Sequence, residues 1–243
     1  MFFDSVKKWI DAGMPFNSFV LGDCNEAMAA MPDRFVELSI VDPPYGIGAD
    51  KKHEKKKLQT HKSKTLSNGY AHNNWDNVIP DEKYFKELKR VSKNQIIFGA
   101  NYFGLMGGYL YWDKCVTMPT YSDGELAYCS LINSVKSFKY AWHGMIQENM
   151  KNKEIRIHPT QKPIALYRWL LQKYAKPGDK IIDTHVGSAS SLIAFEMEGF
   201  YDYVGFELDK DYYRDSKNRL EQWRKNRHPE LFEVSEYRQA VNY

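Results

Sequence analysis

Short apolar segments that end in a glycine or an acidic residue recur along this chain, and stretches with helical spacing separate them. The segments end at Gly22-Asp23, Asp42, Gly99, Asp183 and Glu207. Strands that alternate with helices form one doubly wound, mostly parallel sheet, because each crossover helix covers a face of that sheet. The carboxyl ends of parallel strands meet at one edge, where ligands bind. The sequence therefore predicts an α/β fold whose site collects these strand ends.

The expected elements follow from apolar periodicity and from the turn residues that bound each run. Strands are expected at 18–21, 36–41, 95–98, 108–112, 125–132, 180–182 and 203–206. Helices are expected at 25–31, from 80–81 onward, and at 164–174, 190–197 and 211–224. Residues 137–157 are polar and aromatic without a clear period, so no element is expected there.

The strand at 36–41 runs directly into Asp42-Pro43-Pro44-Tyr45. Proline has a fixed φ and no N–H, so it neither extends a strand ladder nor starts a helix comfortably. The carbonyl oxygens of Asp42 and Pro43 should therefore lie free beside the Asp42 carboxylate, with the Tyr45 ring at the same strand end. Such acceptors and a stacking surface suit a planar base with an exocyclic amine. The alternative is an ordinary loop exit, since Asp and Pro are common turn residues.

A second polar segment, Asp183 to Ser188, has the order strand, glycine loop, helix that a nucleotide-like ligand requires. Gly187 would let the backbone approach a ligand or would simply make a turn. Glu207 follows the loop at close to the sequence spacing at which an acid that binds ribose is expected. The GxGxxG pattern is missing, because Ala189 stands where a second glycine is expected; an alanine fits there if its φ is negative. The acids favour a cationic or zwitterionic adenosine ligand over a phosphate.

The formal net charge of +3 is too small to identify a nucleic-acid partner, but its distribution is uneven. Residues 51–64 contain one glutamate and seven lysines: Lys51, Lys52, Lys55, Lys56, Lys57, Lys62 and Lys64. Such a run is typical of a solvated loop. Beside a strand-end site it could equally bind phosphates, and we favour contact with DNA.

Three cysteines without CxxC spacing indicate neither a disulfide framework nor a metal site. The amino-terminal segment does not resemble a signal peptide, and no apolar stretch approaches the length that spans a bilayer. The expectation is a soluble cytoplasmic protein without a membrane partner.

The motifs together resemble the S-adenosylmethionine-dependent DNA amino-methyltransferases of the β class. In that family a DPPY-type catalytic segment comes first and the cofactor loop comes late. The same order is found here in Asp42 to Gly46, His158 to Pro163, Asp183 to Ser188, and Glu207. The resemblance covers about residues 22–220 and implies a Rossmann-like methyltransferase fold.

The resemblance also implies roles for single residues. Asp42, Pro43, Pro44 and Tyr45 would form the catalytic segment, with Asp42 also next to the cofactor. The Asp183, Gly187 and Ser188 loop would hold the methionine end of S-adenosylmethionine, with Glu207 at the ribose and Asp23 near the adenine. Thr160 and Lys162 would contact or close over the methionine, and His185 would pack over the cofactor edge.

One methyltransferase domain is expected over 1–243, with a catalytic half at about 18–135 and a cofactor-binding half at about 158–224. A small recognition insert would lie at 137–157 and a tail at 225–243. Gln147, Asn149, Asn152 and Arg156 are candidates for reading base edges. So short a recognition region suits a monomer with a short site, a homodimer, or a partner restriction or specificity subunit.

The favoured activity is methylation of adenine N6 in a base flipped out of double-stranded DNA, because an Asp before Pro-Pro-Tyr goes more often with adenine in this family. Cytosine N4 is the main alternative. An RNA or protein methyltransferase, a degenerate DNA-binding module and an NAD-dependent oxidoreductase remain as further alternatives.

Overall fold

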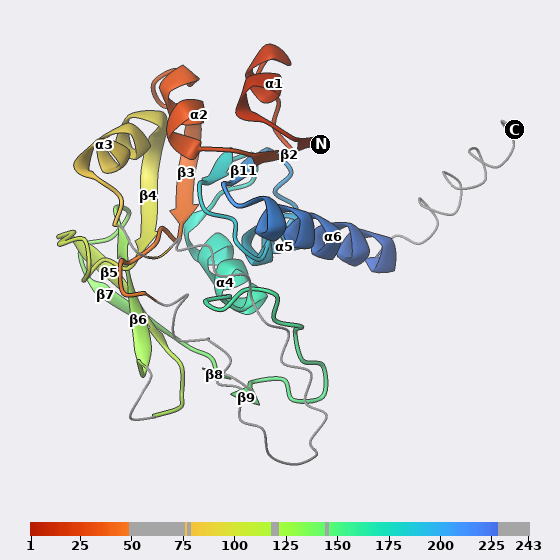
Figure 1. Cartoon of the computed structure of the whole chain (residues 1–243). Helices are drawn as coiled ribbons and strands as arrows, with labels where there is room; N and C mark the ends of the chain where they lie inside the picture. Colours follow the sequence, from red (N-terminus) through yellow and green to blue (C-terminus); the bar gives the residue numbers. More distant parts are fainter. Residues whose placement is uncertain (49–75, 77–78, 118–121, 144–145, 228–243) are drawn as a thin grey trace, which may run out of the picture.

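The computed structural model describes residues 1–48, 76, 79–117, 122–143 and 146–227, and the following statements concern these residues. Nine strands form one sheet in the order β1-β2-β11-β10-β3-β4-β6-β5-β7 (Figure 1). Among them β6 alone is antiparallel to its neighbours. The predicted α/β fold with a mostly parallel sheet is confirmed. The strands are β1 Phe2–Phe3, β2 Ser18–Leu21, β3 Val36–Val41, β4 Ser92–Phe98, β5 Gly108–Asp113, β6 Gly124–Cys129, β7 Val135–Lys139, β10 Ile181–Asp183 and β11 Tyr203–Glu207.

Six helices flank this sheet in the described part of the chain. They are α1 Val6–Asp11, α2 Cys24–Ala30, α3 Glu82–Val91, α4 Ile164–Tyr174, α5 Ser190–Met197 and α6 Lys210–Arg227. The bounds of α4, α5, β2 and β3 agree with the prediction, and the other predicted elements occur with shifted ends. The elements β1 and α1 were not expected.

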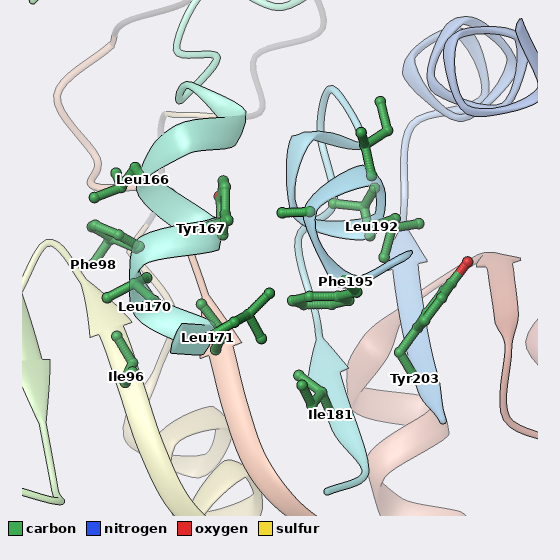
Figure 2. Close-up of a cluster of buried hydrophobic side chains, with 14 of the residues drawn as sticks. Ile96, Phe98, Leu166, Tyr167, Leu170, Leu171, Ile181, Leu192, Phe195 and Tyr203 are labelled. Atoms are coloured by element: carbon green, nitrogen blue, oxygen red, sulfur yellow. The ribbon is translucent and has the colours of Figure 1, made fainter. Parts of the chain in front are cut away.

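Helices cover both faces of the sheet, and neighbouring strand residues point to opposite faces. Ile96 and Phe98 pack with α4 and α5, whereas Ile97 packs with α2 and α3. Figure 2 shows Leu166 and Leu170 of α4 beside Phe98 and Ile96 of β4. Two hydrophobic cores result, which explains why the strands read as continuous apolar runs.

The unexpected amino-terminal helix contributes to one of these cores through a single large side chain. Trp9 of α1 is fully buried, and its ring lies edge-on to Phe206 at 5.3 Å between centroids. Its indole N–H donates to the Pro15 carbonyl at 2.9 Å. Because α1 is six residues long, tertiary packing rather than intrinsic propensity stabilises it.

The strand order reverses between β10 and β3. The chain leaves β3 toward β4 by way of α3, and it leaves β10 toward β11 by way of α5 on the opposite face. The crossovers therefore diverge and leave a crevice at the carboxyl ends of these two strands, the usual ligand site of such sheets.

The residues expected as a recognition insert begin with sheet structure. Val135–Lys139 pairs with β5 as an edge strand, so the expectation of no element over 137–139 is wrong. Its mostly exposed side chains leave no apolar period to detect. The short strands β8 Trp142–His143 and β9 Ile146–Gln147 pair with each other. No helix among the described residues is long and apolar enough to cross a membrane.

The packing of α4 predicts a clear asymmetry between its two faces. Leu170 is fully buried, so Leu170→Ala should lower the free energy of unfolding by about 2–5 kcal/mol. Exposed Lys173 on the same helix provides the control, and Lys173→Ala should change that free energy by at most about 0.5 kcal/mol. Urea denaturation of both variants measures the difference; equal losses would contradict the packing described here.

Candidate functional site

Two cavities open at the carboxyl ends of the strands and share one wall. Their volumes are about 580 and 670 Å³. The first is lined by the glycine loop before α5 and by the end of β11, and the second by the ends of β5 and β6. The residues that line both are Asp42, Pro44, Thr160, Gln161 and Lys162.

The Asp42 to Tyr45 segment leaves the sheet after Val41, the last residue of β3 that pairs with β4. The two prolines donate no hydrogen bonds, so Tyr45 and Gly46 carry the next free amides. Both amides donate to Oδ1 of buried Asp76, at 2.8 and 2.9 Å. Asp76 thus clamps the segment, a role that its sequence context did not indicate.

The Tyr45 ring rests on the backbone of Gly99 at the end of β4. A Cβ on Gly99 would lie 2.4 Å from Cε1 of Tyr45, and the residue has a φ of +78°. On the same ring, Tyr102 stacks at 4.9 Å with an interplanar angle of 16°. The strand-end glycine is therefore what allows Tyr45 to lie against the sheet.

Four charged side chains form a cluster in the shared wall, here called the Asp42–Lys162–Glu125–Lys114 cluster. The Lys162 ammonium lies 2.5 Å from Asp42 Oδ2 and 3.0 Å from Glu125 Oε2. Lys114 contacts the other oxygen of Glu125 at 2.7 Å. The Tyr45 hydroxyl donates to Asp42 Oδ1 at 2.6 Å. Sequence analysis identified Asp42 and Lys162 but neither Glu125 nor Lys114, which follow no recognisable motif.

Burial and charge act against each other in this cluster. Burial alone would lower the pKa of Lys162, whose side chain is 2% exposed, but Asp42 and Glu125 raise it above its ordinary value. Burial would raise the pKa of Glu125, yet the two lysines lower it to about 2. For Asp42, burial is the largest effect and raises the pKa, with a further increase from Glu125. Lys162 and Glu125 are thus held as a charged pair.

Glu207 lines the first cavity and organises its glycine loop. Its Oε2 accepts from the Gly187 amide at 2.8 Å, and its Oε1 accepts from the Asp209 amide at 2.9 Å. Burial raises the pKa of this carboxyl to about 7. Asp23, His185 and Ser188, all predicted from the sequence, line the same cavity.

Asp183 differs from the other predicted cofactor residues, because it lines neither cavity. Its oxygens accept from the His185 amide at 3.0 Å and the Ser191 hydroxyl at 2.5 Å. Burial raises the pKa of this carboxyl to about 7. In this structure the Asp183 carboxylate thus supports the start of the glycine loop and the first turn of α5.

Ala189 does not have the negative φ at which an alanine fits easily. Ala189 has φ 61° and ψ 19°, in the left-handed region, where it forms the N-cap of α5. An L-residue there carries a cost of about 1–2 kcal/mol, because its Cβ approaches the following carbonyl oxygen. Gly187 two residues earlier also has a positive φ, of 55°. The loop thus has two residues with positive φ, one of them an alanine.

The loop before α4 contributes Thr160 and Lys162 to the shared wall. Nδ1 of His158 accepts from the Thr160 amide at 3.3 Å, and burial, together with the charge of Lys162, lowers the pKa of this imidazole to about 3. The Trp142 indole donates to the Gln161 carbonyl at 2.8 Å. Neutral His158 thus fixes the loop that carries the Lys162 ammonium to Asp42.

The candidate DNA contacts divide into two groups. The seven lysines of the 51–64 run lie outside the described residues. Gln147, a candidate for base reading, is buried and bonded through both amide atoms to the backbone of Glu154, at 2.9 and 2.8 Å. It fixes the insert instead, so that interpretation of Gln147 is wrong. Arg156 lines the second cavity and donates to the Pro159 carbonyl at 2.5 Å.

Comparison with known proteins identifies sequences that are similar to this chain. Residues 131–218 match the N6/N4 methyltransferase family model, described as DNA methylase. The putative methylase YubD of Escherichia coli (strain K12) is 24% identical over 227 residues, covering 83% of this chain and 89% of that protein. The type II methyltransferase M2.DpnII of Streptococcus pneumoniae is 31% identical over 90 residues, which cover 37% of this chain and 33% of M2.DpnII.

Two solved structures share the fold. The M1.HpyAVI–SAM complex aligns with a TM-score of 0.51 and 18% identity, over 83% of this chain and 98% of that one. The PvuII DNA methyltransferase (cytosine-N4-specific) aligns with a TM-score of 0.53 and 12% identity, over 92% and 93%. Taken with the family match and the relatives, these findings agree with the resemblance of the sequence motifs. Over residues 131–218 the chain is therefore similar to DNA methylases of the N6/N4 type, and it has the fold of known methyltransferase structures.

Proposed function

We propose that this protein transfers a methyl group from S-adenosylmethionine to the exocyclic N6 of an adenine that has left the DNA duplex. One observation carries the proposal: the Asp42 carboxylate stands in the wall between two cavities, so it faces a ligand on either side. A reaction between two bound molecules needs such an arrangement, because most of the catalysis comes from orientation.

The first cavity suits S-adenosylmethionine in size and in chemistry. Its volume falls in the range of about 300–1,000 Å³ that is usual for ligand sites. None of the ion pairs among the described residues includes Asp183 or Glu207. A cationic ligand in this cavity would favour the ionised form of Glu207, which lines it. Glu207 and Asp23 would bind hydroxyl and amine groups, and His185 would pack on the ligand's edge.

The second cavity suits a flipped base. The stacked rings of Tyr45 and Tyr102 offer an aromatic surface, and Tyr102 is 42% exposed and able to move aside. No described donor contacts the Pro43 carbonyl, so it can accept one hydrogen of the amine while Asp42 accepts the other. These two bonds would localise the nitrogen lone pair.

S-adenosylmethionine, when bound, supplies an activated methyl group on a sulfonium. The remaining work falls to Asp42 and Pro43, which orient the amine along the line of attack. As the nitrogen gains the methyl group it loses one proton, and the Asp42 carboxylate accepts that proton. The lysines at 51–64 are proposed to hold the DNA backbone.

The identity of the methylated base tests the proposed activity directly. Duplex DNA treated with the protein and S-adenosylmethionine is digested to nucleosides and analysed by mass spectrometry. We expect the modified nucleoside N6-methyldeoxyadenosine. N4-methylcytosine alone would replace adenine with cytosine as the substrate, and methylation of RNA or protein in preference to DNA would overturn the proposal.

Removing the proposed acceptor should separate chemistry from binding. Asp42→Ala should reduce kcat by at least about 100-fold, because the amine loses its charged acceptor. Cofactor affinity, measured by calorimetry, should change little, because the other residues lining the first cavity remain in place. Asp11→Ala, at an exposed residue of α1, serves as the control. Turnover near that of the unchanged protein would exclude Asp42 from catalysis.

The contact between Gly99 and Tyr45 predicts a difference between two glycines with similar backbones. Gly99 and Gly178 have φ values of +78° and +85°, but a Cβ on Gly178 would meet nothing within 4 Å. Gly99→Ala should displace the Tyr45 ring and lower kcat by about 10-fold or more, as misplaced catalytic groups do. Gly178→Ala should lose stability by about 1 kcal/mol and keep its activity. Similar kcat values for both variants would show that the ring contact is unimportant.

A further inference from the structure

Both oxygens of the Asp42 carboxylate are occupied in this structure. Oδ1 accepts from the Tyr45 hydroxyl at 2.6 Å, and Oδ2 contacts the Lys162 ammonium at 2.5 Å. An incoming amine must therefore share an oxygen with one of these donors, and a turn of the carboxylate toward the amine weakens one of these bonds. The bond to Lys162 is the costly one to give up, because its ammonium is buried and a buried charge without a partner is strongly unfavourable.

Glu125 provides a second partner for the same ammonium. Its Oε2 lies 3.0 Å from Nζ of Lys162, and its Oε1 is anchored by Lys114 at 2.7 Å. The residue lies on β6, where it pairs with Trp112 of β5, so the sheet fixes its backbone. Glu125 lines the second cavity and not the first.

We propose that Glu125 is a positioning residue that holds the Lys162 ammonium while Asp42 turns to the substrate amine. This inference rests on the proposed function and adds a residue to it. When Asp42 bonds to the amine, Lys162 keeps one carboxylate partner and needs no water. When Asp42 then takes the proton from the nitrogen, it becomes neutral, and Glu125 still balances Lys162. The cluster thus lets one carboxylate act on the substrate without exposing a buried cation.

The charged and titratable groups that interact electrostatically with Asp42 come from several elements. They are Lys162 before α4, Glu125 on β6, Tyr45 on the same segment, Tyr167 on α4, Tyr84 on α3 and Asp183 on β10. Glu125 and Asp183 are the other carboxylates of this set, and Glu125 is the one that raises the pKa of Asp42 most directly. Removal of its charge should therefore lower the pKa of Asp42.

Glu125→Gln tests the inference, since it keeps the shape of the side chain and removes its charge. We expect kcat to fall by about 10- to 100-fold, the usual effect of losing an outer partner of a reacting group. Cofactor affinity should remain within about threefold, because Glu125 is absent from the first cavity. In a plot of kcat against pH, the acid limb should move to lower pH, because Asp42 would ionise at lower pH. A purely structural role would lower kcat without that displacement.

A second readout does not depend on methyl transfer. Carbon-13 NMR titration of the carboxyl groups in the protein alone should show a lower midpoint for Asp42 in Glu125→Gln than in the unchanged protein. Glu37→Gln is the matched control, because Glu37 lies at the opposite end of β3 and pairs with Lys93 at 2.7 Å. In that control, kcat and the Asp42 midpoint should stay unchanged.

The possible outcomes separate this inference from the proposed function. If the unchanged protein methylates no DNA, the proposed function fails, and the NMR titration still tests the coupling of the two carboxylates. If the unchanged protein is active but Glu125→Gln keeps kcat within about twofold, or the Asp42 midpoint does not fall, Glu125 has no positioning role. A loss of cofactor binding equal to the loss of kcat would also overturn it.

Discussion

The Lys162 ammonium joins the two halves of the chain at the site. It comes from the loop before α4, in the second half, and binds Asp42 after β3 and Glu125 on β6 in the first half. Because Lys162 is buried, it requires a carboxylate partner; Asp42 and Glu125 both provide one, and the wall between the cavities depends on that pairing. Neutral His158 and the Trp142 indole hold the loop in the orientation that this pairing needs.

The carboxyls of the site work in contrasting electrostatic environments. Two lysines lower the pKa of Glu125 to about 2, whereas burial raises the pKa of Asp183 and Glu207 to about 7. Carboxyl groups whose surroundings give them different pKa values commonly have different roles in a site. Here the acid next to lysines balances charge, and the acids on the cofactor side are left for a cationic ligand and for the glycine loop.

Backbone conformation decides the fine geometry of both cavities. Gly99 allows the Tyr45 ring to lie on the sheet, and Gly187 with Ala189 turns the loop before α5. Ala189 holds a left-handed conformation at a cost that glycine would avoid, and backbone strain of this kind concentrates at functional sites. Asp76 adds the last constraint by accepting from the amides of Tyr45 and Gly46, the first two residues after the prolines.

The sequence was sufficient to predict the α/β sheet and the bounds of α4 and α5, because these features depend on local apolar periodicity and on turn residues. It also predicted that Asp42, Glu207 and the glycine loop converge, because parallel strands end at the same edge of a sheet. Glu125, Lys114 and Asp76 could not be predicted, since each acts through partners distant in sequence. The sequence likewise did not reveal that the Asp183 carboxylate bonds to the His185 amide and to Ser191 of α5. The sequence alone thus determined which strand ends meet, whereas tertiary packing decided which buried charges face one another, because an ion pair depends on distance in space and leaves no period along the chain.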